Sequence, residues 1–87
     1  MSNVEGEEVM FSGENVTLRK SFTNSSALAF ARYNQLLFHL EITFQNGTVY
    51  RYKGVDPVTV NEFFKAESAG RFFQANILKG HLCERLK

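Results

Sequence analysis

The chain has 87 residues, of which 44% are hydrophobic, and its formal net charge at pH 7 is +1. This size and composition indicate one compact domain, and the single cysteine, Cys83, excludes an internal disulfide and fits a reducing compartment. No apolar run is long enough to cross a bilayer, and the glutamates near the N-terminus are untypical of a signal peptide, so we expect a cytoplasmic protein with no membrane attachment.

Charge divides the chain into two parts. Residues 1–15 contain four glutamates and no Lys or Arg, which predicts a mobile acidic arm. Residues 16–87 contain ten basic and five acidic residues and are predicted to form the single domain. A mildly basic domain is compatible with nucleic-acid binding but does not require it.

Two segments before residue 35 favour strands. Apolar and polar residues alternate over Val16–Phe22, which is typical of a short strand. A turn-forming cluster follows at residues 23–26. Residues 27–33 combine helical propensity with alternation, and we favour a strand because so short a helix has little support of its own.

The clearest strand is predicted over Leu36–Gln45, followed by a turn and a second strand that ends at Gly54. A two-residue turn at Asn46-Gly47 would place Arg51 and Lys53 on the apolar face, at a cost on the order of several kcal/mol. A three-residue loop, with Gly47 at positive φ, shifts the pairing by one residue and removes this conflict. The predicted partners are then Ile42 with Tyr50, Leu40 with Tyr52, and Glu41 with Arg51.

Two helices are predicted after the hairpin. Asp56 is a favoured N-cap and Pro57 a favoured first helical residue, and an apolar stripe continues to about Glu67. Ser68 would cap a second, short helix that ends near Lys79-Gly80. Residues 81–87 form either a tail or a last strand.

Together these elements predict an α+β fold. An antiparallel meander of three strands, or four with Val16–Phe22, is followed by two helices packed on one face. The predicted core contains Leu36, Phe38, Leu40, Ile42, Phe44, Tyr50, Val60, Phe63 or Phe64, Phe73 and Ile77.

Several short motifs occur in a fixed order along the chain. They are Ser25-Ser26, Tyr50-Arg51-Tyr52, Val55-x-Pro57, Ser68-x-Gly70-Arg71-Phe72-Phe73 and Ile77-x-x-Gly80. In this order they resemble the KTSC domain, a family named for its occurrence at the C-terminus of some lysyl-tRNA synthetases. The resemblance covers residues 25–80 and implies a free-standing small protein of bacterial or phage type. It also implies an aromatic tail after Gly80, where this chain instead has His81-Leu82-Cys83.

Basic and aromatic residues provide the candidate nucleic-acid-binding positions, which are Arg51, Lys53, Arg71, Phe72 and Lys79. Their cations would contact phosphate, and an exposed Phe72 would stack on a base. The alternative for Arg51 is a cross-strand pair with Glu41 on a solvated face. Tyr50 and Tyr52 either stack on bases or fill the seam between sheet and helix, and the predicted register favours the seam.

Ser68, Gly70 and Arg71 form a candidate anion site, because a helix start presents free N–H groups beside a cation. The alternative is an ordinary junction between two helices. Cys83 with His39 or His81 has neither a catalytic nor a zinc-binding spacing, and no phosphate-binding glycine loop is present. We therefore expect no catalytic residues, no metal and no cofactor.

Two functions remain open from the sequence. The first, slightly favoured, is non-catalytic binding of RNA or another nucleic acid, which the synthetase association of the resembled family suggests. The alternative is a protein-interaction adaptor or inhibitor of bacterial or phage origin that binds a host or bacterial protein. Basic side chains beside an exposed aromatic would favour the first function, and a contiguous exposed apolar patch would favour the second.

Overall fold

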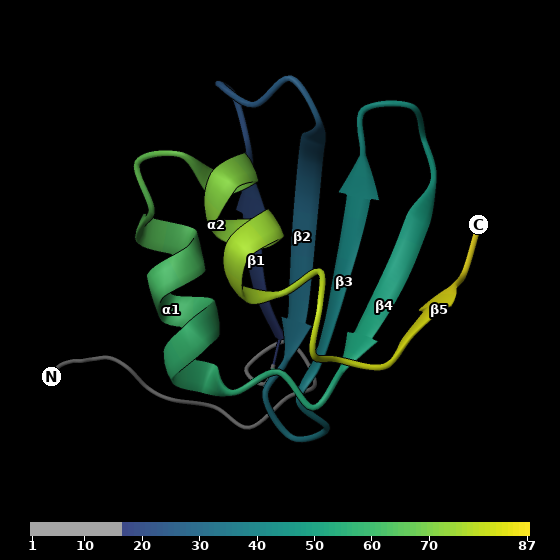
Figure 1. Cartoon of the computed structure of the whole chain (residues 1–87). Coiled ribbons are helices and arrows are strands. Elements are labelled where there is room, and N and C mark those ends of the chain that lie inside the picture. The colour runs from purple at the N-terminus through teal and green to yellow at the C-terminus, as the bar shows by residue number, and fades with distance from the viewer. Residues whose placement is uncertain (1–16) are drawn as a thin grey trace, which may run out of the picture.

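The structure is a computed structural model that describes residues 17–87. Five antiparallel strands form one sheet in the order β1-β2-β3-β4-β5, and two helices lie on one of its faces (Figure 1). The elements are β1 (Thr17–Ser21), β2 (Leu28–Asn34), β3 (His39–Phe44), β4 (Val49–Lys53), α1 (Pro57–Lys65), α2 (Ala69–Asn76) and β5 (Cys83–Arg85). The predicted α+β fold is confirmed, with β5 as an additional strand. The predicted acidic arm at residues 1–15 lies outside the described residues.

The hairpin of β3 and β4 has the predicted register. Ile42 pairs with Tyr50, and the pairs Leu40–Tyr52 and Glu41–Arg51 follow from it. Gly47 has a φ of 91°, and its N–H donates to the Phe44 carbonyl at 2.9 Å, which closes the three-residue loop. The conformation that the loop requires at Gly47 is one that residues with a Cβ rarely adopt.

Both predicted helix caps are present. The Asp56 carboxylate accepts a hydrogen bond from the Val58 N–H at 2.9 Å, and Pro57 is the first residue of α1. The Ser68 hydroxyl accepts from the Arg71 N–H at 3.3 Å at the start of α2. α1 ends at Lys65, slightly before the predicted end, because Ala66 has an extended backbone. No helix in residues 17–87 is both long enough and apolar enough to cross a membrane.

The core lies between the helices and the sheet. Its buried residues are Phe22, Leu28, Ala31, Tyr33, Leu40, Ile42, Tyr52, Val55, Val60, Phe63, Phe73 and Ile77. Tyr33 was not predicted to be in the core. Its side chain is completely buried, and its hydroxyl donates a 2.6 Å hydrogen bond to the Val55 carbonyl. This bond satisfies the polar end of an otherwise apolar side chain.

The prediction that Leu36 and Phe38 belong to the core is wrong. Their exposed fractions are 73% and 44%, because β3 begins only at His39 and residues 35–38 form a turn. The Asn34 side-chain oxygen accepts hydrogen bonds from the N–H groups of Leu36 and Leu37, at 2.9 and 3.1 Å. These bonds hold the turn, so the alternating pattern does not continue as a strand through it. We call the exposed residues Leu36–Phe38 the apolar tip.

Two other core predictions need adjustment. Phe44 and Tyr50 are only half-buried and pack against the edge of the core. Phe63, rather than Phe64, is the fully buried member of its pair. α2 covers the part of the helix-facing surface next to α1, so the part nearer β4 stays partly exposed (Figure 1).

Candidate functional site

Arg51 and Lys53 lie on the open face of the sheet, which we define as the face turned away from α1 and α2. Arg51 donates to the carboxylates of Glu41 and Glu84, each at 3.2 Å, and Lys53 Nζ lies 3.2 Å from the same Glu84 oxygen. The hydrogen bond that Arg51 donates to Glu41 raises the pKa of Arg51, and the hydrogen bond that Glu84 accepts from Lys53 lowers the pKa of Glu84. Both predicted phosphate-binding cations therefore already have carboxylate partners.

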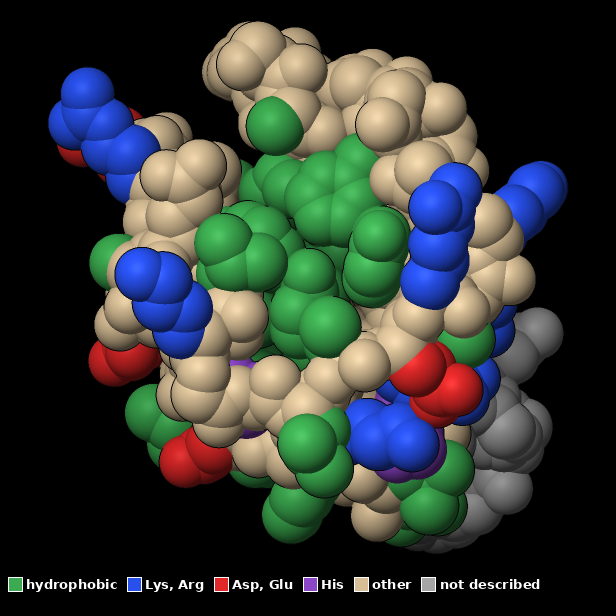
Figure 2. Space-filling view, turned by 45° about the vertical axis from the view of Figure 1, so that its right-hand side comes forward, with side chains coloured by type: hydrophobic (Ala, Val, Ile, Leu, Met, Phe, Trp, Pro, Cys, Tyr) green, Lys and Arg blue, Asp and Glu red, His purple; other side chains and the backbone are tan. Residues whose placement is uncertain are grey.

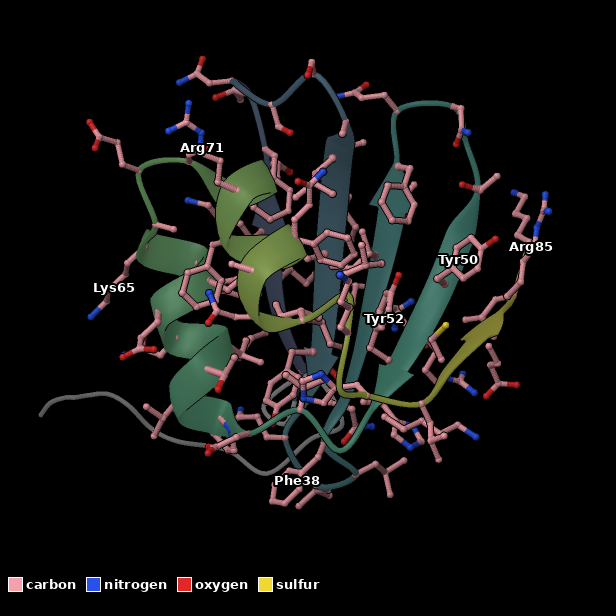
Figure 3. All side chains as sticks on the ribbon, viewed as in Figure 1. Phe38, Tyr50, Tyr52, Lys65, Arg71 and Arg85 are labelled. Carbon is pink, nitrogen blue, oxygen red and sulfur yellow. The ribbon has the colours of Figure 1, made fainter. Side chains whose placement is uncertain are left out.

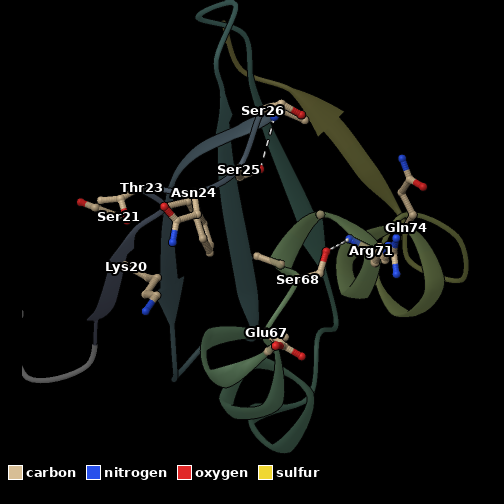
Figure 4. Close-up of a pocket in the computed structure, with 15 residues that line it drawn as sticks. Lys20, Ser21, Thr23, Asn24, Ser25, Ser26, Glu67, Ser68, Arg71 and Gln74 are labelled. Atoms are coloured by element: carbon tan, nitrogen blue, oxygen red, sulfur yellow. Dashed lines mark hydrogen bonds between the residues drawn. The ribbon is translucent and has the colours of Figure 1, made fainter.

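The predicted anion-binding group, Ser68, Gly70 and Arg71, lies on the opposite side of the sheet at a cleft (Figure 4). The cleft has a volume of about 570 Å³ and opens between the β1–β2 loop and the start of α2. Ser68 uses its hydroxyl to cap α2, and the first turn of this helix begins at the cleft. A helix N-terminus attracts negative charge through its free N–H groups.

The β1–β2 loop is fastened in place on the far wall of the cleft. The Ser25 hydroxyl accepts hydrogen bonds from the N–H groups of Ala27 and Leu28, at 3.2 and 2.9 Å. Gln45 Nε2 donates to the Ser25 and Leu28 carbonyls, at 3.3 and 3.0 Å. A Cβ built at Gly70 would lie 3.9 Å from the Ser25 hydroxyl, which is an ordinary contact. The approach of this loop therefore does not require glycine at position 70.

Two cations from distant parts of the sequence line this cleft. Lys20 comes from β1 and Arg71 from α2, and Glu67 is the only carboxylate among the lining residues. Arg71 was predicted from the sequence, whereas Lys20 and the lining side chains of Asn24 and Gln74 were not. A signal for Lys20 was present, because strand alternation places it on the same face as the buried Phe22. The cleft thus combines a positive lining, serine hydroxyls and a helix N-terminus.

A group of aromatic residues occupies the helix-side surface beside α2. The ring of Phe44 lies 6.0 Å from that of Tyr50 and 5.7 Å from that of Phe73, and Tyr52 packs on Phe73 at 5.4 Å. Hydrophobic side chains gather in the middle of this surface, with Lys or Arg side chains on both sides (Figure 2). Tyr50 lies next to its cross-strand partner Arg85 (Figure 3). We call the partly exposed rings of Phe44 and Tyr50, which pack on and beside the buried Phe73, the aromatic surface.

The two tyrosines of the Tyr-x-Tyr motif differ in their surroundings. Tyr52 is 2% exposed and belongs to the core, as its register predicted. Burial raises the pKa of Tyr52 to about 12, so its hydroxyl stays neutral at physiological pH. Tyr50 is half-buried and presents part of its ring at the surface. Only Tyr50 is therefore available to contact a ligand.

The remaining predicted residues do not join either group of cations. Phe72 is half-buried and stacks on Phe63 at 5.9 Å, so it is not the exposed aromatic that was expected. Lys79 lies exposed after the end of α2. Cys83 is exposed on the helix side of β5, whereas His39 lies on the open face opposite Lys53. Within residues 17–87, no three His, Cys, Asp or Glu side chains cluster so as to hold a metal ion.

Comparison with known proteins identifies the family but no biochemical activity. The family model of the KTSC domain matches residues 24–80. The crystal structure of the KTSC domain protein YPO2434 from Yersinia pestis is similar, with a TM-score of 0.73 and 32% sequence identity, over 82% of this chain and 99% of that one. No protein of curated function matches. The order of the motifs, the family match and the common fold agree, and the chain belongs to the KTSC domain family.

Proposed function

We propose that this protein is a non-catalytic module that binds single-stranded nucleic acid, RNA or DNA, on the helix side of its sheet. The observation that carries the proposal is the presence of Lys20 and Arg71 in the lining of one cleft. Two cations and a helix N-terminus suit a phosphate group, and most of the affinity of nucleic-acid-binding proteins comes from such contacts.

The aromatic surface supports a nucleic acid over a simple anion. Phe44 and Tyr50 are half-buried, so their rings are held by the core while one part remains accessible. Bases of single strands stack on aromatic side chains held in this way. Gln45 connects the two regions, because it follows Phe44 directly and fastens the loop that lines the cleft. A strand that places one phosphate in the cleft and continues across the sheet toward β4 would bring a later base to Tyr50.

Fluorescence anisotropy with a labelled single-stranded oligonucleotide tests this proposal. We expect the association constant to fall with rising salt, and Lys20→Gln and Arg71→Gln each to reduce the slope of that dependence by about 0.7. Lys65→Gln is the matched control, because Lys65 is exposed at the end of α1, is not among the residues that line the cleft, and points outward from α1, apart from Arg71 (Figure 3). Binding that is independent of salt, or that weakens equally in all three variants, would contradict the proposal.

The apolar tip favours a second candidate function, that of a protein-interaction adaptor. Leu36, Leu37 and Phe38 are consecutive and have exposed fractions of 73%, 59% and 44%. Phe38 also has a φ of 60°, which is unusual for a bulky residue. Exposed apolar residues grouped in this way often mark protein contacts. A bacterial protein captured after nuclease treatment by the wild type, but not by Leu37→Ser, would favour this function over nucleic-acid binding.

A further inference from the structure

A row of charged residues crosses the open face of the sheet. The cross-strand pairs are Arg19 with Arg32, Arg32 with Glu41, Glu41 with Arg51, and Arg51 with Glu84. The row lies on the open face because Arg32 stands between Ala31 and Tyr33, both of which are buried toward the helices. Neither helix covers this row (Figure 1).

The carboxylates of this row form ion pairs only at the end of the row that lies on β3, β4 and β5. Glu41 is bound by Arg51, and Glu84 by Arg51 and Lys53, all at 3.2 Å. Among residues 17–87, no carboxylate lies within 4.0 Å of the guanidinium of Arg19 or of Arg32. Glu41 faces Arg32 across the strands, but its carboxylate is turned to Arg51 instead. Two exposed arginines at the β1–β2 end of the row therefore form no ion pair with any other described residue.

Direct opposition of two like charges across a sheet is unfavourable. Side chains of directly opposed residues in an antiparallel pair start about 4.5–5.5 Å apart, and like charges there destabilise the sheet. The residues that flank the two arginines on this face add no negative charge. Ser21 pairs with Phe30 on one side, and Thr17 pairs with Asn34 on the other. An anion that contacts both arginines would relieve this opposition.

We propose that Arg19 and Arg32 form a clamp that binds a phosphate monoester on the open face. Two guanidinium groups supply two positive charges, which match the charge of about −1.5 to −2 that a monoester carries at pH 7. Each guanidinium presents a planar set of donors that fits phosphate oxygens in pairs. This site is separate from the cleft of the proposed function, because Lys20 and Arg71 lie on the helix side.

Inorganic phosphate is a direct probe for this clamp. At low ionic strength, 10 mM phosphate should raise the thermal midpoint of the full chain by several degrees over sodium chloride of equal ionic strength, if Kd is about 1 mM. Arg32→Gln should abolish this rise. Arg19→Gln should raise the midpoint without phosphate by about 1–4 °C, because it removes the like-charge opposition and keeps the pairing of Arg32 with Glu41. Arg32→Lys keeps the charge without the planar donors and should weaken the phosphate effect several-fold.

Two further variants separate the clamp from the cleft. Arg71→Gln should keep the phosphate-dependent rise, and Lys65→Gln controls for the loss of one positive charge elsewhere. In NMR titrations of the wild type, phosphate should shift the side-chain Nε–H signals of Arg19 and Arg32 together. A rise that persists in Arg32→Gln but disappears in Arg71→Gln would overturn the clamp and leave the cleft as the anion site. Loss of oligonucleotide binding in Arg71→Gln without loss of the phosphate effect would support both.

A comparison of phosphate sources completes the test. An oligonucleotide with a 5′-phosphate and the same oligonucleotide with a 5′-hydroxyl differ only in the monoester, as do O-phosphoserine and serine. In at least one pair, the phosphorylated member should bind more tightly to the wild type, and Arg32→Gln should remove that difference. The pair that shows the difference identifies the chemical source of the phosphate monoester. Equal binding within both pairs would contradict a site for monoesters.

Discussion

Replacing Tyr33 by Phe removes a single buried hydroxyl and tests how the fold joins β2 to the loop before α1. The hydroxyl donates a 2.6 Å hydrogen bond to the Val55 carbonyl, and both residues are completely buried. The substitution leaves the carbonyl without a partner in a place that water does not reach. Such an unsatisfied group costs about 1–3 kcal/mol of the free energy of unfolding, so the thermal midpoint should fall by roughly 4–8 °C per kcal/mol.

Urea denaturation followed by circular dichroism measures this loss, and Tyr50→Phe is its matched control. Tyr50 is half-buried and its hydroxyl has no hydrogen-bond partner among residues 17–87, so its loss should change the free energy of unfolding by no more than about 0.5 kcal/mol. If the two variants lose stability equally, the Tyr33 hydrogen bond contributes nothing special and the reasoning is wrong. An unchanged slope of free energy against urea would confirm that the native state remains compact.

Four further changes test other parts of the structure. Ile42→Ala should cost about 2–5 kcal/mol of unfolding free energy because Ile42 is completely buried; a loss of a few tenths would contradict its place in the core. Gly47→Ala should lower the free energy of unfolding by about 1 kcal/mol or more. The positive φ of this position is the cause, since no atom lies within 4 Å of the added Cβ. The raised pKa of Tyr52, about 12, means that stability is complete below pH 10 and falls as the pH rises toward 12, and Tyr52→Phe should remove that part of an alkaline unfolding curve. The lowered pKa of Glu84 means that its stabilisation of β5 is present above about pH 4.5 and is lost on further acidification, so the protection factors of the β5 amides, referred to the intrinsic exchange rate at each pH, should fall there in the wild type but not in Glu84→Gln.

The hairpin could be predicted in detail because two local signals agreed. Asn46-Gly47 marked the turn, and the alternation of charged and apolar residues on β4 allowed one register only. A slip of one residue would have turned Arg51 and Lys53 into the core, and the large cost of burying two cations separated the alternatives. The helix caps at Asp56 and Ser68 were also predictable from local sequence, because each cap is a hydrogen bond between residues two or three positions apart.

The apolar tip shows where hydrophobic alternation alone is insufficient. The pattern from Leu36 to Phe44 is continuous, but the hydrogen bonds from Asn34 close a turn over its first residues. A competing bond between a side chain and the backbone does not appear in an apolar pattern. Tyr33 was missed as a core residue because the register of β2 shifts between Leu28 and Phe30, so that Tyr33 rather than Phe30 continues the buried face after Leu28.

The candidate site was predictable only where its residues are close in sequence. Ser68, Gly70 and Arg71 were found as one group, and the structure places them at the cleft together. Lys20 joins them only through the packing of β1 near α2. For Arg51, the sequence left open phosphate binding or a cross-strand pair with Glu41; the structure has that pair, and the pairing of β5 with β4 adds Glu84. Contacts of this kind depend on tertiary structure.

The place of β5 in the chain also affects how the protein is made. The edge of β4 is covered by residues 83–85, which a ribosome synthesises after both helices. Until then, the backbone groups of β4 on this side have no partner, and an unpaired strand edge is the usual starting point for intermolecular pairing. A chain that ends after Gly80 would keep that edge permanently. Such truncated products should accumulate as aggregates or strand-exchanged oligomers, and an added peptide with the sequence of residues 81–87 should suppress them.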